Sequence, residues 1–396
     1  MKSIFVIFLL FVNLLSFAQV IKTEVKPKIV GNRVEGEYIE FDDSGYMKLK
    51  ANYSSNKLHG EWLMYSYKEI LLIKGNYLNG FKHGEWICFY NSGSISQKYQ
   101  YKNGKEDGLC EEYHENGQLK TSKNYVDGNL EGNVVGYFSN GDTSYVNDHS
   151  NGKLDGVSIY WYSDGILADS ITYKDGKKHG AFVIYYVNGL VCKKGSFDEG
   201  KKSGFWQYWY DNGQLRKSGI YKNDLPEGKW IKFFKSGKLK YEVVLKEGKL
   251  NGDFIRYYKN GNVKENGTAV MDIPEGKFVH YHKNGVEDEM GKFKDGKKTG
   301  LWTGYYENGA KNFEQKYIEG WIEGINRHYF ETGILSSEGE YKKGKLHGSY
   351  ITNFKNGKVH MKGKYIDGKF SGDIYTYDVD GNLLKKQKMV NGEKVD

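Results

Sequence analysis

The chain has 396 residues, with 58 Lys and Arg against 50 Asp and Glu, a formal net charge of +8 and a mean hydropathy of -0.70. It contains 51 Gly and 34 Tyr but only 3 Pro, and 16% of its residues are aromatic. Intrinsic disorder is excluded as a description, because disordered chains are depleted in aromatic and β-branched residues. A folded, turn-rich chain without a large closed core is expected instead.

The first eighteen residues are typical of a signal peptide. Lys2 precedes an apolar run from Ile4 to Leu15, and Ser16 and Ala18 are the small residues that signal peptidase requires. A membrane anchor is the alternative, but the run is shorter than the ~20 residues that span a bilayer. We expect residues 1–18 to be removed before Gln19, and the protein to be secreted, periplasmic or otherwise in the cell envelope.

A 24-residue repeat fills the remainder of the chain. Stepping by 24 residues from the glycine of the Lys-His-Gly segment reaches glycine every time, and these anchor glycines define fifteen repeats over residues 36–395. Residues 19–35 are expected to form an N-terminal cap or partial repeat. The anchor glycines are Gly36, Gly60, Gly84, Gly108, Gly132, Gly156, Gly180, Gly204, Gly228, Gly252, Gly276, Gly300, Gly324, Gly348 and Gly372.

Two further glycine rows accompany the anchor row, which is counted as position zero of each repeat. Position nine is glycine except at Glu69, and position twenty is glycine except at Asn56, Asp224 and Asp272. Asn and Asp tolerate the left-handed backbone conformation best after glycine, so position twenty is predicted to require a positive φ. Asn-Gly and Asp-Gly between strand-like runs indicate hairpin turns. Each repeat therefore contains two chain reversals.

The strands between these turns follow a period of two. Position five is aromatic in every repeat except at Asn353, and position two often carries Trp. A two-residue turn at positions eight and nine would pair position two with fifteen and position six with eleven. Trp86 would then face Tyr99, Trp62 would face Gly75, and Trp206 would cover Gly219 as a ring over a bare glycine.

These patterns predict an all-β fold: an elongated, single-layer twisted sheet of about fifteen tandem β-hairpin repeats. No 15-residue window holds a helical apolar stripe without a turn glycine, so essentially no helix is expected. Strands should pair only with sequence neighbours, which makes stability a sum of local interfaces.

No pattern of catalytic, cofactor-binding or metal-binding residues emerges. Cys88, Cys110 and Cys192 occupy different repeat positions and are interpreted as packing residues, with a Cys88–Cys110 bridge as the alternative. His59, His83, His179 and His347 precede anchor glycines and are interpreted as turn-flanking residues, whereas His280 and His282 could hold a surface metal weakly. Catalytic motifs are missing from the sequence, so a non-enzymatic protein without cofactors is predicted.

Two rows are candidates for binding. Trp206, Tyr208, Trp209 and Tyr210 could stack on sugar rings, although cross-strand packing is the preferred interpretation. Position twenty-one is Lys in nine repeats and could attract an anionic polymer or lipid headgroups, although solubility of an open sheet is preferred. These lysines are Lys57, Lys105, Lys153, Lys177, Lys201, Lys249, Lys297, Lys345 and Lys369.

The segment from Gly75 to Trp86 resembles the MORN repeat, which has Gly, an aromatic residue, Gly and then His-Gly at this spacing. Gly195 to Trp206 and Gly339 to Tyr350 are similar, and the resemblance covers about residues 31–395. Conventional MORN repeats have glycine two residues after His-Gly, where this chain has a ring or an aliphatic residue. The chain is thus similar to the bacterial variant, of which some members are labelled antitoxins, and the resemblance implies protein contacts or membrane association.

We therefore expect a scaffold that binds a partner protein along its sheet. A module that binds cell-wall carbohydrate through its aromatic rows, an anionic lipid surface as partner, and an immunity or antitoxin-like protein are the alternatives. Nucleic acid is not expected as a partner, because the protein is predicted to leave the cytoplasm.

Overall fold

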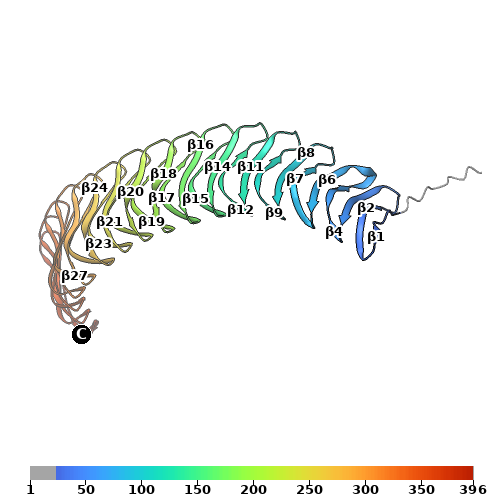
Figure 1. Ribbon diagram of the computed structural model, residues 1–396. Coiled ribbons are helices and arrows are strands. Elements are labelled where there is room, and N and C mark those ends of the chain that lie inside the picture. Colours follow the sequence, from blue (N-terminus) through green and yellow to red (C-terminus); the bar gives the residue numbers. More distant parts are fainter. Residues whose placement is uncertain (1–23, 396) are drawn as a thin grey trace, which may run out of the picture. The chain divides into compact units, whose positions relative to one another are not determined.

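The computed structural model describes residues 24–395, so the predicted signal peptide lies outside the described residues. This part of the chain is all β and contains no α-helix, as the sequence predicted. Its single helical element is the 3₁₀ turn η1 (Tyr67–Glu69), which replaces the usual loop in the repeat where Glu69 interrupts the glycine row. Figure 1 shows the succession of antiparallel hairpins, with turns along both edges.

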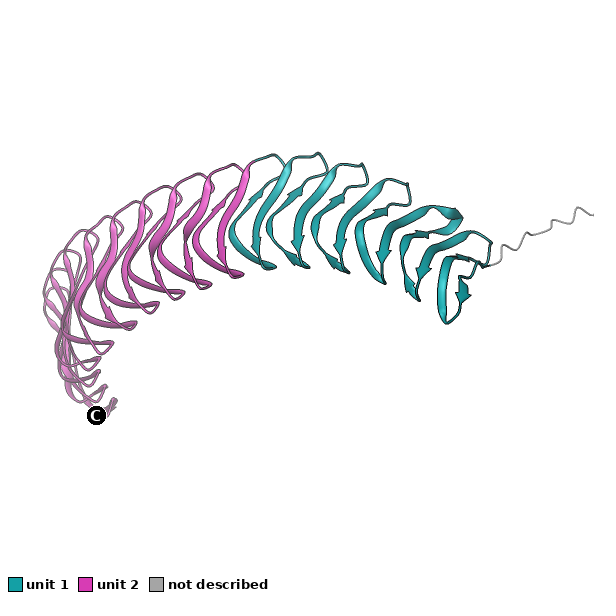
Figure 2. Ribbon diagram, viewed as in Figure 1, with its two compact units in different colours: residues 1–165 teal, residues 166–396 magenta. Residues whose placement is uncertain are grey.

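The chain divides into two compact units, residues 1–165 and 166–396, which are described separately (Figure 2). Each unit is an open antiparallel sheet in which strands pair with their neighbours in sequence. The strands of the first unit are β1 (Lys28–Val30), β2 (Arg33–Phe41), β3 (Met47–Ser54), β4 (Lys57–Leu58), β5 (Gly60–Tyr65), β6 (Leu71–Leu78), β7 (Phe81–Phe89), β8 (Ile95–Lys102), β9 (Lys105–Glu106), β10 (Gly108–Tyr113), β11 (Leu119–Val126), β12 (Asn129–Leu130), β13 (Gly132–Tyr137), β14 (Thr143–Ser150) and β15 (Lys153–Trp161).

The second unit continues the same alternation of strands. Its strands are β16 (Leu167–Lys174), β17 (Lys177–Tyr185), β18 (Val191–Asp198), β19 (Lys201–Trp209), β20 (Leu215–Lys222), β21 (Leu225–Phe233), β22 (Leu239–Lys246), β23 (Lys249–Tyr257), β24 (Val263–Val270), β25 (Ile273–Tyr281), β26 (Glu287–Lys294), β27 (Lys297–Tyr305), β28 (Lys311–Ile318), β29 (Trp321–Ile322), β30 (Gly324–Tyr329), β31 (Leu335–Lys342), β32 (Lys345–Asn353), β33 (Val359–Ile366), β34 (Lys369–Phe370), β35 (Gly372–Tyr377), β36 (Leu383–Val390) and β37 (Glu393–Val395).

The predicted register of the first hairpin is correct at one end and wrong at the other. Position two pairs with fifteen, as in Trp206 with Gly219, but position five rather than six pairs with eleven, as in Trp209 with Leu215. The turn has three residues, because the amide of Gly213 donates to the carbonyl of Tyr210, and the amide of Tyr210 donates to that of Gln214. A type I turn followed by a left-handed glycine explains the one-residue shift.

The second turn of each repeat is the predicted two-residue reversal. Positions nineteen and twenty both have positive φ, and the three exceptions in the glycine row adopt it as well: Asn56 at 65°, Asp224 at 68° and Asp272 at 70°. These three side chains also accept a hydrogen bond from a backbone amide twenty-two residues earlier, at 2.6 to 2.9 Å. The hydrogen bond to the side chain therefore offsets the strain that a residue with a Cβ has at a positive φ, which glycine would avoid.

The anchor glycines mark a bulge between successive hairpins. All fifteen have positive φ, from 66° at Gly228 to 130° at Gly252. Register shifts occur beside them, for example between Ser218 and Ile220 of β20 where it pairs with β21. The uniformity of the row thus has a backbone origin.

Side chains at positions two, four, thirteen, fifteen and seventeen form the aromatic face, and those at positions one, three, five, eleven, fourteen and sixteen form the opposite face. In the second unit the buried core of the aromatic face contains Phe182, Trp206, Tyr221, Trp230 and Phe254. Trp206 is 1% exposed, and its ring centre lies 5.4 Å from Phe182 and 5.2 Å from Phe197.

The indole that covers a bare glycine at position fifteen comes from the following repeat, whereas Gly136 and Gly304 at position four are covered by Tyr145 and Phe313 of their own hairpins. Trp206 pairs with Gly219 as predicted, yet a Cβ on Gly219 would overlap Trp230 instead. Trp86 covers Gly75, Trp206 covers Gly195 and Trp302 covers Gly291 in the same way. The predicted interaction of an indole with a glycine is therefore present, but it joins neighbouring repeats rather than closing one hairpin.

Polar side chains also link each repeat to the next. At position six a ring hydroxyl donates to the carbonyl at position five of the following repeat, at 2.7 to 3.0 Å, in Tyr90, Tyr186, Tyr210, Tyr258 and Tyr306. At position eight an amide nitrogen donates to position seven of the following repeat, at 2.8 to 3.2 Å, in Asn116, Asn188, Asn212, Asn260, Asn284, Asn308 and Asn356. Carboxylates cannot donate this bond, which explains the preference for Asn before glycine.

Candidate functional site

The four aromatic candidates do not form one platform. Trp206 is buried in the aromatic face, and its Nε1 donates to the carbonyl of Ser196 at 3.1 Å. Tyr208 lies on the same face beneath Lys217, whose Nζ is 4.4 Å from the ring centre, and burial raises the pKa of the Tyr208 hydroxyl. Trp209 belongs to the opposite face, and Tyr210 donates to the carbonyl of Phe233 at 3.0 Å. Trp206 leaves no open ring for a sugar, and the other three are half-buried.

The nine lysines at position twenty-one are all exposed, including Lys153, Lys177 and Lys201. Several of their aliphatic stems lie against the turn glycine of the following repeat, as Lys105 does at Gly128 and Lys297 at Gly320. Acidic residues at position nineteen interrupt the positive charge, and Lys177 forms a 3.0 Å ion pair with Glu199. The aliphatic stems of these lysines therefore pack on the turns. Together with the acidic residues at position nineteen, the lysines give this edge of the sheet charge of both signs.

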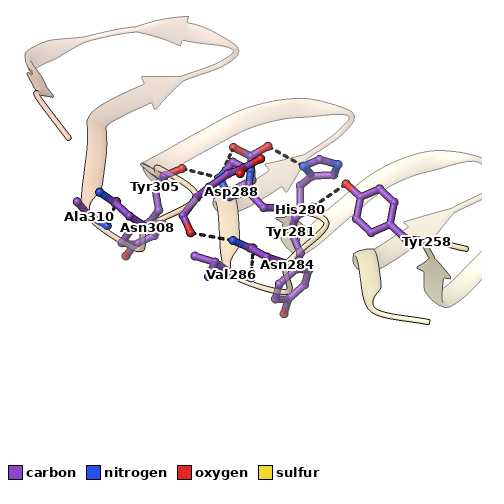
Figure 3. Close-up of polar contacts among 11 residues, drawn as sticks. Tyr258, His280, Tyr281, Asn284, Val286, Asp288, Tyr305, Asn308 and Ala310 are labelled. Carbon is purple, nitrogen blue, oxygen red and sulfur yellow. Dashed lines mark hydrogen bonds and ion pairs between the residues drawn. The ribbon is translucent and has the colours of Figure 1, made fainter. Parts of the chain in front are cut away.

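His280 and His282 converge on the carboxylate of Asp288, and Figure 3 shows the contact of His280 with it. Nδ1 of His280 lies 2.8 Å from Oδ2 of Asp288, and Nε2 of His282 lies 3.3 Å from Oδ1. Nε2 of His282 also donates to the carbonyl of Tyr305 at 2.8 Å, so it replaces the tyrosine hydroxyl of other repeats. Within residues 24–395 no group of three His, Cys, Asp or Glu side chains is arranged to hold a metal ion.

The three cysteines are free thiols. Cys110 is 1% exposed at position two of its repeat, where other repeats place Trp or Phe. Burial raises the pKa of the Cys110 thiol to about 12. The thiol is therefore protonated at neutral pH and acts as a packing residue, as the sequence suggested, and it forms no bridge to Cys88.

The opposite face carries a row that the sequence analysis did not single out. At position one, large apolar side chains point into solvent: Phe205 is 57% exposed, Leu301 61% and Ile325 50%. Phe205 pairs directly with Ile220, which is also exposed. Only some repeats have an apolar residue at position one, so the row gives a weak signal in the sequence and becomes evident only with exposure.

The fold and these surfaces define a tandem-repeat β-sheet protein with an open, partly apolar face. The family model described as MORN repeat variant matches seven segments of the chain: residues 82–103, 106–127, 149–175, 204–223, 226–247, 250–268 and 322–343. Five of these begin two residues before an anchor glycine, in the register found here. The chain is thus similar to this repeat variant at seven repeat positions. None of the curated proteins matches it.

Similar solved structures include two large assemblies. A crystal structure of TcdB2-TccC3-Cdc42 is 9% identical over 90% of this chain and 23% of that chain, with a TM-score of 0.15. A Photorhabdus luminescens Tc holotoxin pore is 9% identical over 90% and 24%, with a TM-score of 0.16. This chain spans less than a quarter of either, and similarity at this level supports no functional argument. Across residues 24–395 the structure has no helix that is long and apolar enough to cross a membrane.

Proposed function

We propose that this protein is a non-enzymatic binding scaffold, and that a partner protein docks on the opposite face of its sheet. The observation that supports this is the row of exposed apolar side chains at position one, with Phe205 against Ile220 and with Leu301 and Ile325 in consecutive repeats. Two strands per repeat place equivalent residues of consecutive repeats ~10 Å apart, so Leu301 and Ile325 are neighbours. Between them and Phe205, position one is occupied by Lys229, Asp253 and Lys277. Apolar side chains that recur on one face are typical of a protein interaction surface.

Position three explains why this face is a surface rather than a second core. Its side chains are mostly half-buried between strands, and Val279 is 2% exposed, so they support the row at position one without covering it. The aromatic face, by contrast, closes over its own glycines. A partner would therefore meet a rigid sheet with apolar side chains already presented, which lowers the entropic cost of binding.

Capture from envelope extracts of the native host tests this function. The mature protein and a Phe205→Ser/Leu301→Ser variant serve as baits, with Val187→Ser as the matched control, because Val187 is 66% exposed but lies in a turn. We expect the wild type and the control to retain a common partner that the double variant loses. Equal capture by the double variant would contradict docking on this face.

We also propose that the scaffold acts outside the cytoplasm, starting at Gln19. Ser16 and Ala18 support this proposal, since they present a signal peptidase site after the apolar run. Mass spectrometry of protein recovered from the native host should find Gln19 at the mature N-terminus. An intact Met1 in the mature product would refute it.

A further inference from the structure

The opposite face is hollowed near the end of the second unit. A depression of about 430 Å³ lies over strands β32, β33 and β35. Ile351, Gly363, Gly372 and the ring of Tyr375 provide apolar lining, and Lys362 and Lys364 stand at its margin. Its volume falls within the range of ~300–1,000 Å³ that is usual for ligand sites.

The hollow results from small residues at position one and from the anchor bulge. Ser349 and Asp373 occupy position one here, where Phe205 and Leu301 stand in other repeats. β33 pairs with β35 only at Met361 and Lys362, and β35 begins at the bulge glycine Gly372, which has a φ of 82°. The floor is therefore not covered by a side chain from either strand.

Positive charge surrounds this apolar floor. Lys362, Lys364, Lys386 and Lys388 are exposed on the same face, and of these only Lys386 forms an ion pair within the described residues, 2.9 Å from Oδ2 of Asp373. That contact lowers the pKa of the Asp373 carboxyl and raises the pKa of the Lys386 amine.

The remaining polar groups do not cancel this charge. Nζ atoms of Lys362 and Lys386 each lie 5.4 Å from the centre of the Tyr375 ring. The other acidic neighbours are Glu340, whose carboxylate accepts a hydrogen bond from the Ser349 amide at 3.4 Å, and Glu338, which pairs with Ile351 across the strands and is bound by Arg327 at 2.7 Å. Four ammonium groups and the Arg327 guanidinium thus face three carboxylates around the hollow, which leaves an excess of positive charge at its margin.

We propose that this hollow takes an apolar side chain from a segment of a partner protein, and that acidic residues flanking that side chain contact Lys362, Lys364 and Lys388. The proposal rests on the proposed scaffold function and names the chemistry of one contact. Interface hot spots are typically anchor side chains that fill a pocket and are ringed by contacts that exclude water. Charge complementarity would orient the segment and accelerate its association.

A protein segment fits this site better than an acidic sugar polymer does. The floor offers Ile351, two glycines and the Tyr375 ring. The Tyr375 hydroxyl already donates to Asp373 at 3.3 Å, while Asp373 is also paired with Lys386. Ser349 is the remaining hydroxyl of the lining, so the floor itself favours an apolar group over a sugar ring. A bilayer with anionic lipids would need a broad apolar surface, because its affinity scales with buried apolar area. The hollow is instead a single depression of about 430 Å³, which accommodates one large apolar side chain with part of the segment that carries it.

Binding of defined peptides to the full mature protein tests the proposal. Fluorescence anisotropy would compare three labelled nonapeptides: a central Leu flanked by four Glu, the same peptide with Ala in place of Leu, and the Leu peptide with Gln in place of Glu. We expect the acidic Leu peptide to bind at least tenfold more tightly than either of the others. Equal binding of the Ala peptide would overturn the anchor, and equal binding of the Gln peptide would overturn the role of the lysines.

Two variants locate the binding. Ser349→Leu fills the hollow with a residue that the fold already accepts at Leu301, and Lys362→Gln/Lys364→Gln removes charge from the margin. Each should lower the affinity for the acidic Leu peptide at least tenfold. Lys177→Gln/Lys201→Gln, which removes equal charge from the turns, should change this affinity less than twofold. Circular dichroism confirms that each variant is folded. Unchanged affinity in Ser349→Leu would overturn the proposal.

Oligouronate and vesicles containing anionic lipid complete the comparison. If either binds the wild type more tightly than the acidic Leu peptide and loses binding in Ser349→Leu, the site serves that class and the proposal is overturned. The Phe205→Ser/Leu301→Ser variant should bind the peptide like the wild type. A failure of the proposal for the hollow, which is measured by peptide binding, is thus distinguishable from a failure of the proposed docking face, which is measured by capture alone.

Discussion

Two regions of the second unit share one backbone repeat but differ in what their faces do. Around residues 195–230, Phe205 and Trp206 occupy positions one and two, and indoles of Trp206 and Trp230 cover Gly195 and Gly219. Around residues 349–388, Asp373 and Ile374 occupy the same two positions. No ring covers Gly363, where Ile374 is the nearest side chain.

The difference shows that two adjacent positions decide the character of each repeat. Position two determines whether the aromatic face closes over the preceding hairpin, and position one determines whether the opposite face presents an apolar side chain or a hollow. The backbone turns are unaffected, because the positive φ values at Gly204 and Gly372 are similar, 69° and 82°. A regular scaffold can therefore vary its surface repeat by repeat.

Removing the central ring should have the largest effect. Trp206→Ala deletes a side chain that is 1% exposed and that contacts Phe197 and Tyr221 in the two flanking strands, so we expect a loss of ~3–5 kcal/mol. Ile374→Ala, the matched change in the other region, should cost about 2 kcal/mol. Urea unfolding followed by circular dichroism measures both, and equal losses would contradict the contrast between the regions.

Adding a methyl group to a covered glycine should have the next largest effect. Gly219→Ala places a Cβ within the Trp230 indole, so the ring must shift, and we expect a loss of ~1–3 kcal/mol. Gly363→Ala meets Ile374 Cγ1 at 3.3 Å and should cost well below 1 kcal/mol. Thermal unfolding of the pair provides the comparison. A Gly363→Ala variant as unstable as Gly219→Ala would show that ring cover does not distinguish the regions.

The amide ladder should contribute less per bond. Asn212→Asp keeps the acceptor for the Gln214 amide but loses the donation to the Lys235 carbonyl at 3.2 Å, so we expect a loss of ~1 kcal/mol. Hydrogen exchange at residues 233–238 should accelerate, while exchange near residue 350 stays unchanged. Ser236→Ala serves as the control, because Ser236 occupies the same position. Identical exchange in Asn212→Asp and wild type would refute the role of the ladder.

The pH dependence of stability that comes from one buried histidine should be the smallest of these effects. Burial lowers the pKa of His328 in the folded chain below the ordinary value of 6.5, which applies in the unfolded chain. Between the folded and the unfolded pKa, the unfolded chain therefore binds a proton at His328 that the folded chain does not bind. Stability from this group is therefore present above pH 6.5 and is lost as the pH falls toward the folded pKa. His328→Thr, which copies Thr352, should melt like the wild type at pH 8 and be relatively more stable at pH 5. The opposite ranking would contradict this assignment.

Much of the fold follows from spacing alone. The period, the positive φ at position twenty, and the pairing of position two with fifteen are all confirmed, because glycine rows and turn residues constrain the backbone directly. The pairing of position six with eleven is wrong, since a three-residue turn at Gly213 fits the sequence as well as a two-residue turn does. Loop length is not determined by the identity of its glycine.

The surfaces were harder to predict, because they depend on contacts between repeats. Trp206 was expected to cover the glycine of its own hairpin and covers that of the preceding one, and the Tyr210 and Asn212 bonds to the next repeat have no counterpart in strand pairing rules. The hollow at Ser349 and Asp373 arises because these residues lack the large apolar side chain that Phe205 and Leu301 have at the same repeat position. Small residues at one repeat position indicate a hollow only once the positions of the neighbouring strands are known.

Hydrogen exchange on Gly180→Val tests most directly the central claim that stability is a sum of interfaces between neighbouring hairpins. Gly180 has a φ of 89°, and a Cβ there would meet Thr172 at an ordinary 3.5 Å, so the change strains the backbone without displacing a ring, at a cost of ~1–3 kcal/mol. We predict faster exchange across β16 to β19 and little change near Gly348. Uniform acceleration along residues 167–395 would contradict the account.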